Sequence, residues 1–269
     1  MNQPARRQSL APELLDGPPR YRARSPWGVI TALIATALVI AIPLLLTIIG
    51  ISVWSAISAP EGASGQEIGD TIDTALSLAK PEGALITALG QLASLALVLG
   101  FASWRGARRD VLAMTGERFS VRTYVVAGLA VIVATGLLEL VLYGLLKFDV
   151  FADTAWLAEG LRSPWGWATV IIAVVLAPVW EELTFRGFLL SALAQTRLGF
   201  WGGALVSNVL WSALHGAYSL PGLISVFVAG LVLSWIVWRT GSIKPAIITH
   251  AVANVFAVAF TYAFAPTPI

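Results

Sequence analysis

Seven long apolar runs constrain the fold of this chain more than any other feature of its sequence. Each run approaches or exceeds the roughly 20 residues that a helix needs to cross the hydrocarbon layer of a membrane. Lipid supplies no hydrogen-bond partners for the backbone, and no run alternates as a barrel strand does, so the runs are predicted to be helices. We therefore expect an all-α, polytopic integral membrane helical bundle of about seven transmembrane helices, over residues 27–53, 84–104, 124–146, 165–193, 200–218, 220–238 and 243–264.

The composition agrees with residence in a membrane. Hydrophobic residues make up 57% of the 269 residues and charged residues only 12%, whereas soluble proteins average roughly 45–50% and 25%. This balance excludes a water-soluble globular protein. The absence of cysteine excludes disulfides and cysteine-based catalysis. The formal charge of +2 is carried by a basic amino terminus and one basic loop, which does not form the charged face of a nucleic-acid-binding protein.

The basic residues predict the orientation of the bundle, because cytoplasmic segments of membrane proteins carry an excess of Lys and Arg. With a cytoplasmic N-terminus, 13 of these residues lie inside and three, Lys80, Lys147 and Arg162, lie outside. We therefore expect the N-terminus to be cytoplasmic. Arg is much commoner than Lys, and Ala, Gly and Trp are abundant, as in GC-rich bacterial genomes, so the bacterial cytoplasmic (plasma) membrane is the expected location.

Three regions are predicted along the chain, of which the first two lack chemical motifs. Residues 1–25 contain four prolines, five arginines and no apolar periodicity, so we expect a disordered basic N-terminal tail. Residues 26–163 are expected to form N-terminal membrane helices with two extracytoplasmic loops. The second loop, residues 148–163, mixes Phe151, Trp156 and Leu157 with charged residues, which is typical of an interfacial helix. A plain connecting loop is an equally good interpretation.

Three acidic residues lie inside the apolar runs. A carboxylate at the centre of a spanning helix costs on the order of 3 kcal/mol, so each of these acids needs a partner or a function. Glu139 has no basic residue near it in the sequence, and a protonated acid hydrogen-bonded to another helix is the favoured interpretation. Glu182 and Arg186 are four residues apart, so they can pair on one helical face. Glu181 points about 100° away from Glu182 and could serve as a general base, or belong to a structural ion-pair cluster.

The only two histidines of the chain also lie in apolar runs. His215 follows Trp211 by four residues, and His250 precedes Asn254 by four. This spacing places the two members of each pair on one helical face. Together with the glutamates, these residues predict a common polar pocket within the membrane.

Depth along the helices gives an independent check on this pocket. Glu181 and His215 each lie 17 residues from Leu198, so a hairpin turning there would place them at the same level. His250 lies only about eight residues beyond the turn at residues 241–242. The last hairpin must therefore be shifted inward by roughly 14 Å for His250 to reach the same pocket.

The order and spacing of these polar residues resemble the motif set of the CAAX prenyl protease and bacteriocin-processing (CPBP) family of intramembrane proteases, whose type II CAAX prenyl endopeptidases are the best match. The resemblance covers residues 165–261, and it assigns residues 164–264 to a CPBP-like catalytic membrane domain. The family more often has Phe where this chain has Trp211, an exchange expected to alter packing more than chemistry. The matching motifs are Glu181-Glu182-x-x-x-Arg186, Trp211-x-x-x-His215 and His250-x-x-x-Asn254.

The resemblance implies hydrolysis of a peptide bond within the membrane. Glu181 would be the general base for a water molecule that His215 also holds. His250 and Asn254 would donate hydrogen bonds to the oxyanion, and such donors commonly contribute about 3 kcal/mol each. Glu182, Arg186 and Trp211 would support these four residues. The substrate would be a peptide precursor or another membrane protein.

Two alternatives to this mechanism stay open at the level of the sequence. Glu181, His215 and His250 could form a zinc site with an open position for water, although a metal-free glutamate mechanism is favoured because it leaves His250 for the oxyanion. A transporter or a non-proteolytic membrane scaffold could also carry ionisable residues near the midplane. The clustering of all motifs in the last four runs, without an inverted repeat, argues against a transporter.

Overall fold

The computed structural model describes residues 9–114, 117–147, 149, 151 and 153–266. Every regular element in this described part of the chain is a helix, which confirms the all-α prediction. The long helices are α2 (Val29–Ser58), α4 (Pro81–Trp104), α6 (Val121–Leu146), α12 (Leu220–Thr240) and α13 (Ile243–Phe264). A further continuous helix, from Gly166 to Leu193, consists of α8 (Gly166–Val170), η1 (Ile171–Leu176), α9 (Ala177–Glu182), η2 (Leu183–Leu189) and α10 (Leu190–Leu193).

Six helices in the described residues are long and apolar enough to cross a membrane, so the chain is a polytopic integral membrane protein. They correspond to six of the seven predicted runs. The remaining run, residues 200–218, forms α11 (Gly199–Ala213), which has 15 residues and is therefore only about 22 Å long. It is shorter than a typical span because the chain leaves the helix at Leu214 and turns before reaching Leu220. The count of seven spans and the cytoplasmic N-terminus stay predictions.

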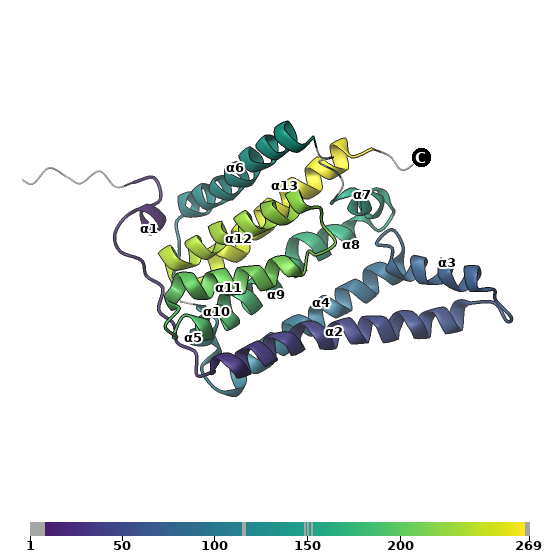
Figure 1. The fold of residues 1–269 in the computed structure, drawn as a ribbon, viewed down its shortest axis with the longest axis horizontal. Helices are drawn as coiled ribbons and strands as arrows, with labels where there is room; N and C mark the ends of the chain where they lie inside the picture. Colours follow the sequence, from purple (N-terminus) through teal and green to yellow (C-terminus); the bar gives the residue numbers. More distant parts are fainter. Residues whose placement is uncertain (1–8, 115–116, 148, 150, 152, 267–269) are drawn as a thin grey trace, which may run out of the picture.

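The helix that carries Glu181 lies in the centre of the bundle. In Figure 1, α2 and α4 run antiparallel on one side of it, and α6 lies on the opposite side beyond α12 and α13. The two segments η1 and η2 are π-helical and flank α9, so the helix is widened on both sides of Glu181. Such π-helical turns are frequent at functional sites.

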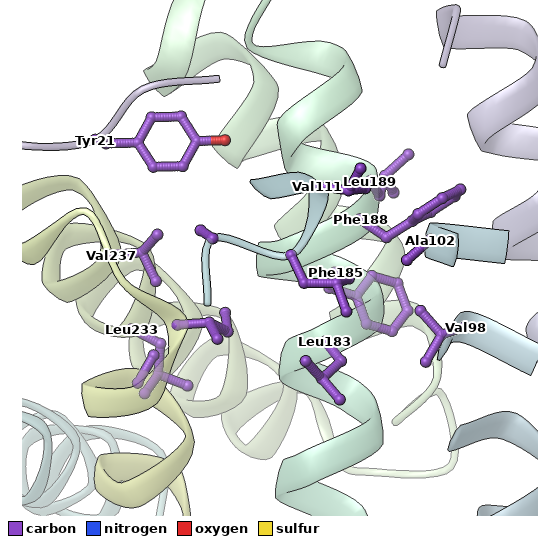
Figure 2. Packing of buried hydrophobic residues seen from close by; sticks show 14 of the residues in the cluster. Tyr21, Val98, Ala102, Val111, Leu183, Phe185, Phe188, Leu189, Leu233 and Val237 are labelled. Atoms are coloured by element: carbon purple, nitrogen blue, oxygen red, sulfur yellow. The ribbon is translucent and has the colours of Figure 1, made fainter. Parts of the chain in front are cut away.

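The main apolar core packs around η2. Phe185, Phe188 and Leu189 are completely buried, and Figure 2 shows Phe188 facing Ala102 of α4. Leu233 of α12 belongs to the same cluster. Because α2, α4, α11 and α13 all contact η2, the position of the Glu181 helix is fixed by packing on several sides.

The N-terminal segment differs from the disordered tail that the sequence predicts. Residues 1–8 lie outside the described residues, but residues 12–15 form α1 (Pro12–Leu15), whose Leu14 is completely buried. Arg239 at the end of α12 donates hydrogen bonds to the carbonyls of Leu14 and Asp16. Ala11 and Leu14 therefore pack onto the bundle, and the prolines shape an extended connection in the described part of this segment.

Both loops expected between the first helices contain helices of their own. The first contains α3 (Gly65–Leu76), which begins with a capping box between Ser64 and Glu67. The second contains α7 (Ala155–Arg162). In α7 the side chain of Leu157 is buried and that of Trp156 is exposed, so the amphipathic helix, not the plain loop, is the correct interpretation of this segment.

Candidate active site

Glu181 lies at the end of α9 with only 8% of its surface exposed. Its Oε2 accepts a hydrogen bond of 2.6 Å from the indole Nε1 of Trp211 on α11. Its Oε1 accepts no hydrogen bond from the described part of the chain. A donor to a carboxylate gives a strong, directional bond, so one oxygen of Glu181 is fixed and the other is open to a small polar molecule.

Glu182 is the centre of a buried charge cluster. Its Oε1 lies 3.0 Å from Nη1 of Arg186 and 2.9 Å from Nδ1 of His250. Both charged partners of this ion pair are at most 1% exposed. The predicted i, i+4 pair is confirmed, and His250 of α13 reaches Glu182, so His250 lies at the depth of the glutamates.

Trp211 connects the two glutamates. The guanidinium of Arg186 lies over its indole ring, 4.0 Å from the centroid, in the geometry of a cation–π contact. The indole N–H donates to Glu181, which a Phe at this position could not do. The exchange of Phe for Trp therefore changes hydrogen bonding at the site, not only packing as the sequence suggests.

His215 lies just past the end of α11, in the turn formed by residues 214–219, and is half-buried. Its Nδ1 is 3.3 Å from the carbonyl oxygen of Trp211. A carbonyl only accepts hydrogen bonds, so this contact favours the tautomer that carries its proton on Nδ1. The lone pair then lies on Nε2. The ring also packs edge-on against the indole of Trp211 at 5.3 Å, which places His215 and Glu181 beside the same side chain.

Asn254 is on α13 and donates a hydrogen bond of 2.7 Å from Nδ2 to the carbonyl of Ala173 in η1. The π-helical register explains why this carbonyl is available. The N–H of Ala177 bonds to the carbonyl of Ile172, five residues back, so the carbonyl of Ala173 would need the N–H of residue 178. Residue 178 is Pro178, which has no N–H. Asn254 replaces the missing donor.

Sequence reasoning missed Asn208. This buried residue accepts a 3.0 Å hydrogen bond from Nη2 of Arg186 and donates one of 2.8 Å to the carbonyl of Phe227 on α12. A Cβ at Gly230 would lie 1.7 Å from Oδ1 of Asn208, so the glycine makes room for this contact. An amide three residues before Trp211 on the same helical face was the signal that could have identified it.

Glu139 is separate from this cluster. Its Oε1 accepts a hydrogen bond of 2.7 Å from the hydroxyl of Ser225 on α12. The predicted hydrogen bond to another helix is therefore confirmed, and it ties α6 to α12.

The alternative zinc site would require Glu181, His215 and His250 to meet around one ion. Within the described ranges, no group of three or more His, Cys, Asp or Glu side chains is close enough to hold an ion. Glu182 occupies Nδ1 of His250 and Trp211 occupies Oε2 of Glu181, so Nε2 of His250 and Oε1 of Glu181 are the atoms left for a ligand. The zinc alternative stays a prediction.

Comparison with known proteins confirms the family resemblance predicted from the motifs. Residues 163–256 match the family model described as type II CAAX prenyl endopeptidase Rce1-like. An Escherichia coli relative, described as an uncharacterized 24.3 kDa protein, is 31% identical over 94 residues. That alignment covers 34% of this chain and 43% of the relative, so the chain matches less than half the length of this curated relative. No solved structure matches the chain.

Proposed function

We propose that this integral membrane protein, similar over residues 163–256 to type II CAAX prenyl endopeptidases, is an intramembrane endopeptidase that uses Glu181 to activate water. The observation that carries the proposal is the state of the Glu181 carboxylate. It is buried, one oxygen is fixed by Trp211, and the other oxygen has no partner in the described residues. A buried acid with one open oxygen in a polar cluster is suited to proton transfer.

In the proposed first step, Oε1 of Glu181 removes a proton from water as the water oxygen attacks the scissile carbonyl carbon. Nε2 of His215 accepts a hydrogen bond from the same water and orients it. The carbonyl oxygen becomes an oxyanion. In the second step, Glu181 returns its proton to the amide nitrogen, the C–N bond breaks, and a carboxylic acid and an amine are released.

His250 and Asn254 are proposed to stabilise the oxyanion. In this role His250 carries a proton on each ring nitrogen, with its Nδ1–H bonded to Glu182 and its Nε2–H donated to the oxyanion. Asn254 uses one amide hydrogen for the carbonyl of Ala173 and has a second for the substrate.

The test of this function is cleavage by the purified protein in proteoliposomes. A panel of membrane-protein fragments and peptide precursors, incubated with wild type and with His215→Ala, would be analysed by mass spectrometry for new termini. We expect the variant to lose about 100-fold or more of the cleavage rate, because it loses the group that orients water. Cleavage that His215→Ala retains in full would contradict this role. The absence of cleavage by wild type across the panel would favour a scaffold or transporter.

The proposed mechanism is free of metal, and a chelator tests this separately. The proposal is supported by the described residues, among which no three His, Cys, Asp or Glu side chains are grouped closely enough to hold an ion. We expect the cleavage rate to be unchanged after incubation with 1,10-phenanthroline and gel filtration. Loss of activity that added zinc restores would contradict the metal-free mechanism and favour the metalloprotease.

Two finer assignments belong to the same proposal. The substrate is a peptide precursor or a membrane protein, and the location is the bacterial plasma membrane. Proteomic comparison of membranes from cells with and without the Glu181→Gln allele would identify uncleaved precursors. Fractionation of the same cells would test the location.

A further inference from the structure

Asp153 lies ten residues before the segment that matches the family, yet it contacts the turn that carries His215. Its Oδ1 accepts a hydrogen bond of 2.6 Å from the backbone N–H of Ser219, and its Oδ2 accepts one of 2.7 Å from the Ser219 hydroxyl. Ser219 is the N-cap of α12. A carboxylate at a helix N-terminus is also favoured by the helix dipole, so Asp153 holds the start of α12 through two bonds and a charge interaction.

Gly222 makes this contact sterically possible. A Cβ at that position would lie 1.9 Å from Oδ2 of Asp153, a distance that no packed structure tolerates. The N–H of Gly222 also donates to the hydroxyl of Ser219. The glycine in the first turn of α12 therefore has a specific task, which is to admit the carboxylate of Asp153.

The turn transmits this constraint to His215. Tyr218, the residue before Ser219, donates its N–H to the carbonyl of His215 at 2.8 Å. Its ring packs edge-on against the imidazole at 5.2 Å. Asp153, Ser219 and Tyr218 thus form a continuous series of contacts to the imidazole.

We propose that Asp153 is a positioning residue for His215. By anchoring Ser219 it fixes the end of the 214–219 turn, and the fixed turn holds the imidazole beside Trp211 and Glu181. Asp153 touches neither the water nor the substrate in this scheme. The catalytic importance of this anchoring rests on the proposed function. The anchoring itself can be measured by an experiment that does not depend on cleavage activity.

The experiment uses diethyl pyrocarbonate, which acylates neutral imidazoles, on the full-length protein in nanodiscs. His215 and His250 are the only histidines, so each protein has one site to measure. His250, which carries two ring protons in the proposed mechanism and is bonded to Glu182, is a second site that should label slowly in every variant whose cluster stays closed. We expect Asp153→Ala to label His215 several-fold faster while the labelling of His250, 7% exposed and bonded to Glu182, is unchanged. Gly222→Ala should reproduce this result, because its methyl group displaces the same carboxylate. Asp153→Asn, which keeps one oxygen to accept from the Ser219 N–H but loses the charge, should label at a rate between those of wild type and Asp153→Ala.

The matched control is Asp149→Ala, which removes another acid of the same loop whose Oδ1 bonds only locally, to the N–H of Phe151. It should leave both labelling rates unchanged.

In the cleavage assay, Asp153→Ala should lower kcat by at least about tenfold, with little change in KM, because small displacements of a catalytic group are costly. Wild-type labelling of His215 in both Asp153→Ala and Gly222→Ala would overturn the inference, as would equal acceleration at both histidines. If labelling changes but Glu181→Gln still cleaves, the anchoring stands and the proposed catalytic role fails.

Discussion

Replacing Glu181 with Gln is expected to lower kcat for peptide cleavage by about 1,000-fold, within the range that general base catalysis provides. Gln has the shape of Glu, and its amide oxygen can still accept the hydrogen bond from Trp211. It cannot take a proton from water. The variant should therefore fold and bind substrate as wild type does and fail only in the chemical step. The measurement is single-turnover cleavage in proteoliposomes, with the thermal midpoint of each protein recorded in parallel.

Glu139→Gln is the matched control for this experiment, because it changes another acid of a spanning helix in the same way. Glu139 bonds to Ser225, and Gln can keep that bond. Its cleavage rate should equal that of wild type. If Glu181→Gln cleaved as fast as Glu139→Gln, Glu181 would not be the base, and the buried acids would be a structural cluster.

The fold was predictable because lipid makes an apolar run of sufficient length nearly equivalent to a helix. The last helix, Ile243–Phe264, begins and ends where its run does. The run after Leu198 was less predictable, since Leu214 is apolar but belongs to a turn, and hydropathy alone does not distinguish the two. The burial of Leu14 was not predicted, because Leu14 lies outside any long apolar run. The short apolar pair Leu14–Leu15 has no periodicity, and only tertiary contacts decide that Leu14 is buried while Leu15 is exposed.

The site was predictable where it depends on helical spacing and not where it depends on contacts between helices. Glu182 and Arg186 pair as their spacing requires. The bonds from Trp211 to Glu181 and from His250 to Glu182 join different helices, so no spacing in the chain specifies them. The task of Asn254 at Ala173 follows from a π-helical register beside Pro178, which single-sequence periodicity does not reveal.

The largest loss of stability is expected from Glu182→Ala. This carboxylate neutralises Arg186, which is 1% exposed, and also accepts from His250. Truncation leaves a buried guanidinium without its counter-charge, and breaking a buried pair in this way typically costs about 3–5 kcal/mol. Asn208 still contacts Arg186 but carries no charge to compensate it. The free energy of unfolding, measured by denaturation in mixed micelles, should fall by this amount.

Glu182→Gln separates the charge from the hydrogen bonds. Its amide oxygen can occupy the position of Oε1 and accept from Arg186 and His250, while its NH2 group takes the place of Oε2, which is buried without a hydrogen-bond partner. We expect its loss of stability to be smaller than that of Glu182→Ala, because Arg186 and His250 keep their acceptor and only one new buried donor is left unsatisfied. Equal losses would mean that the negative charge itself holds the cluster together. Wild-type stability in Glu182→Ala would contradict the buried ion pair, and would mean that water reaches Arg186.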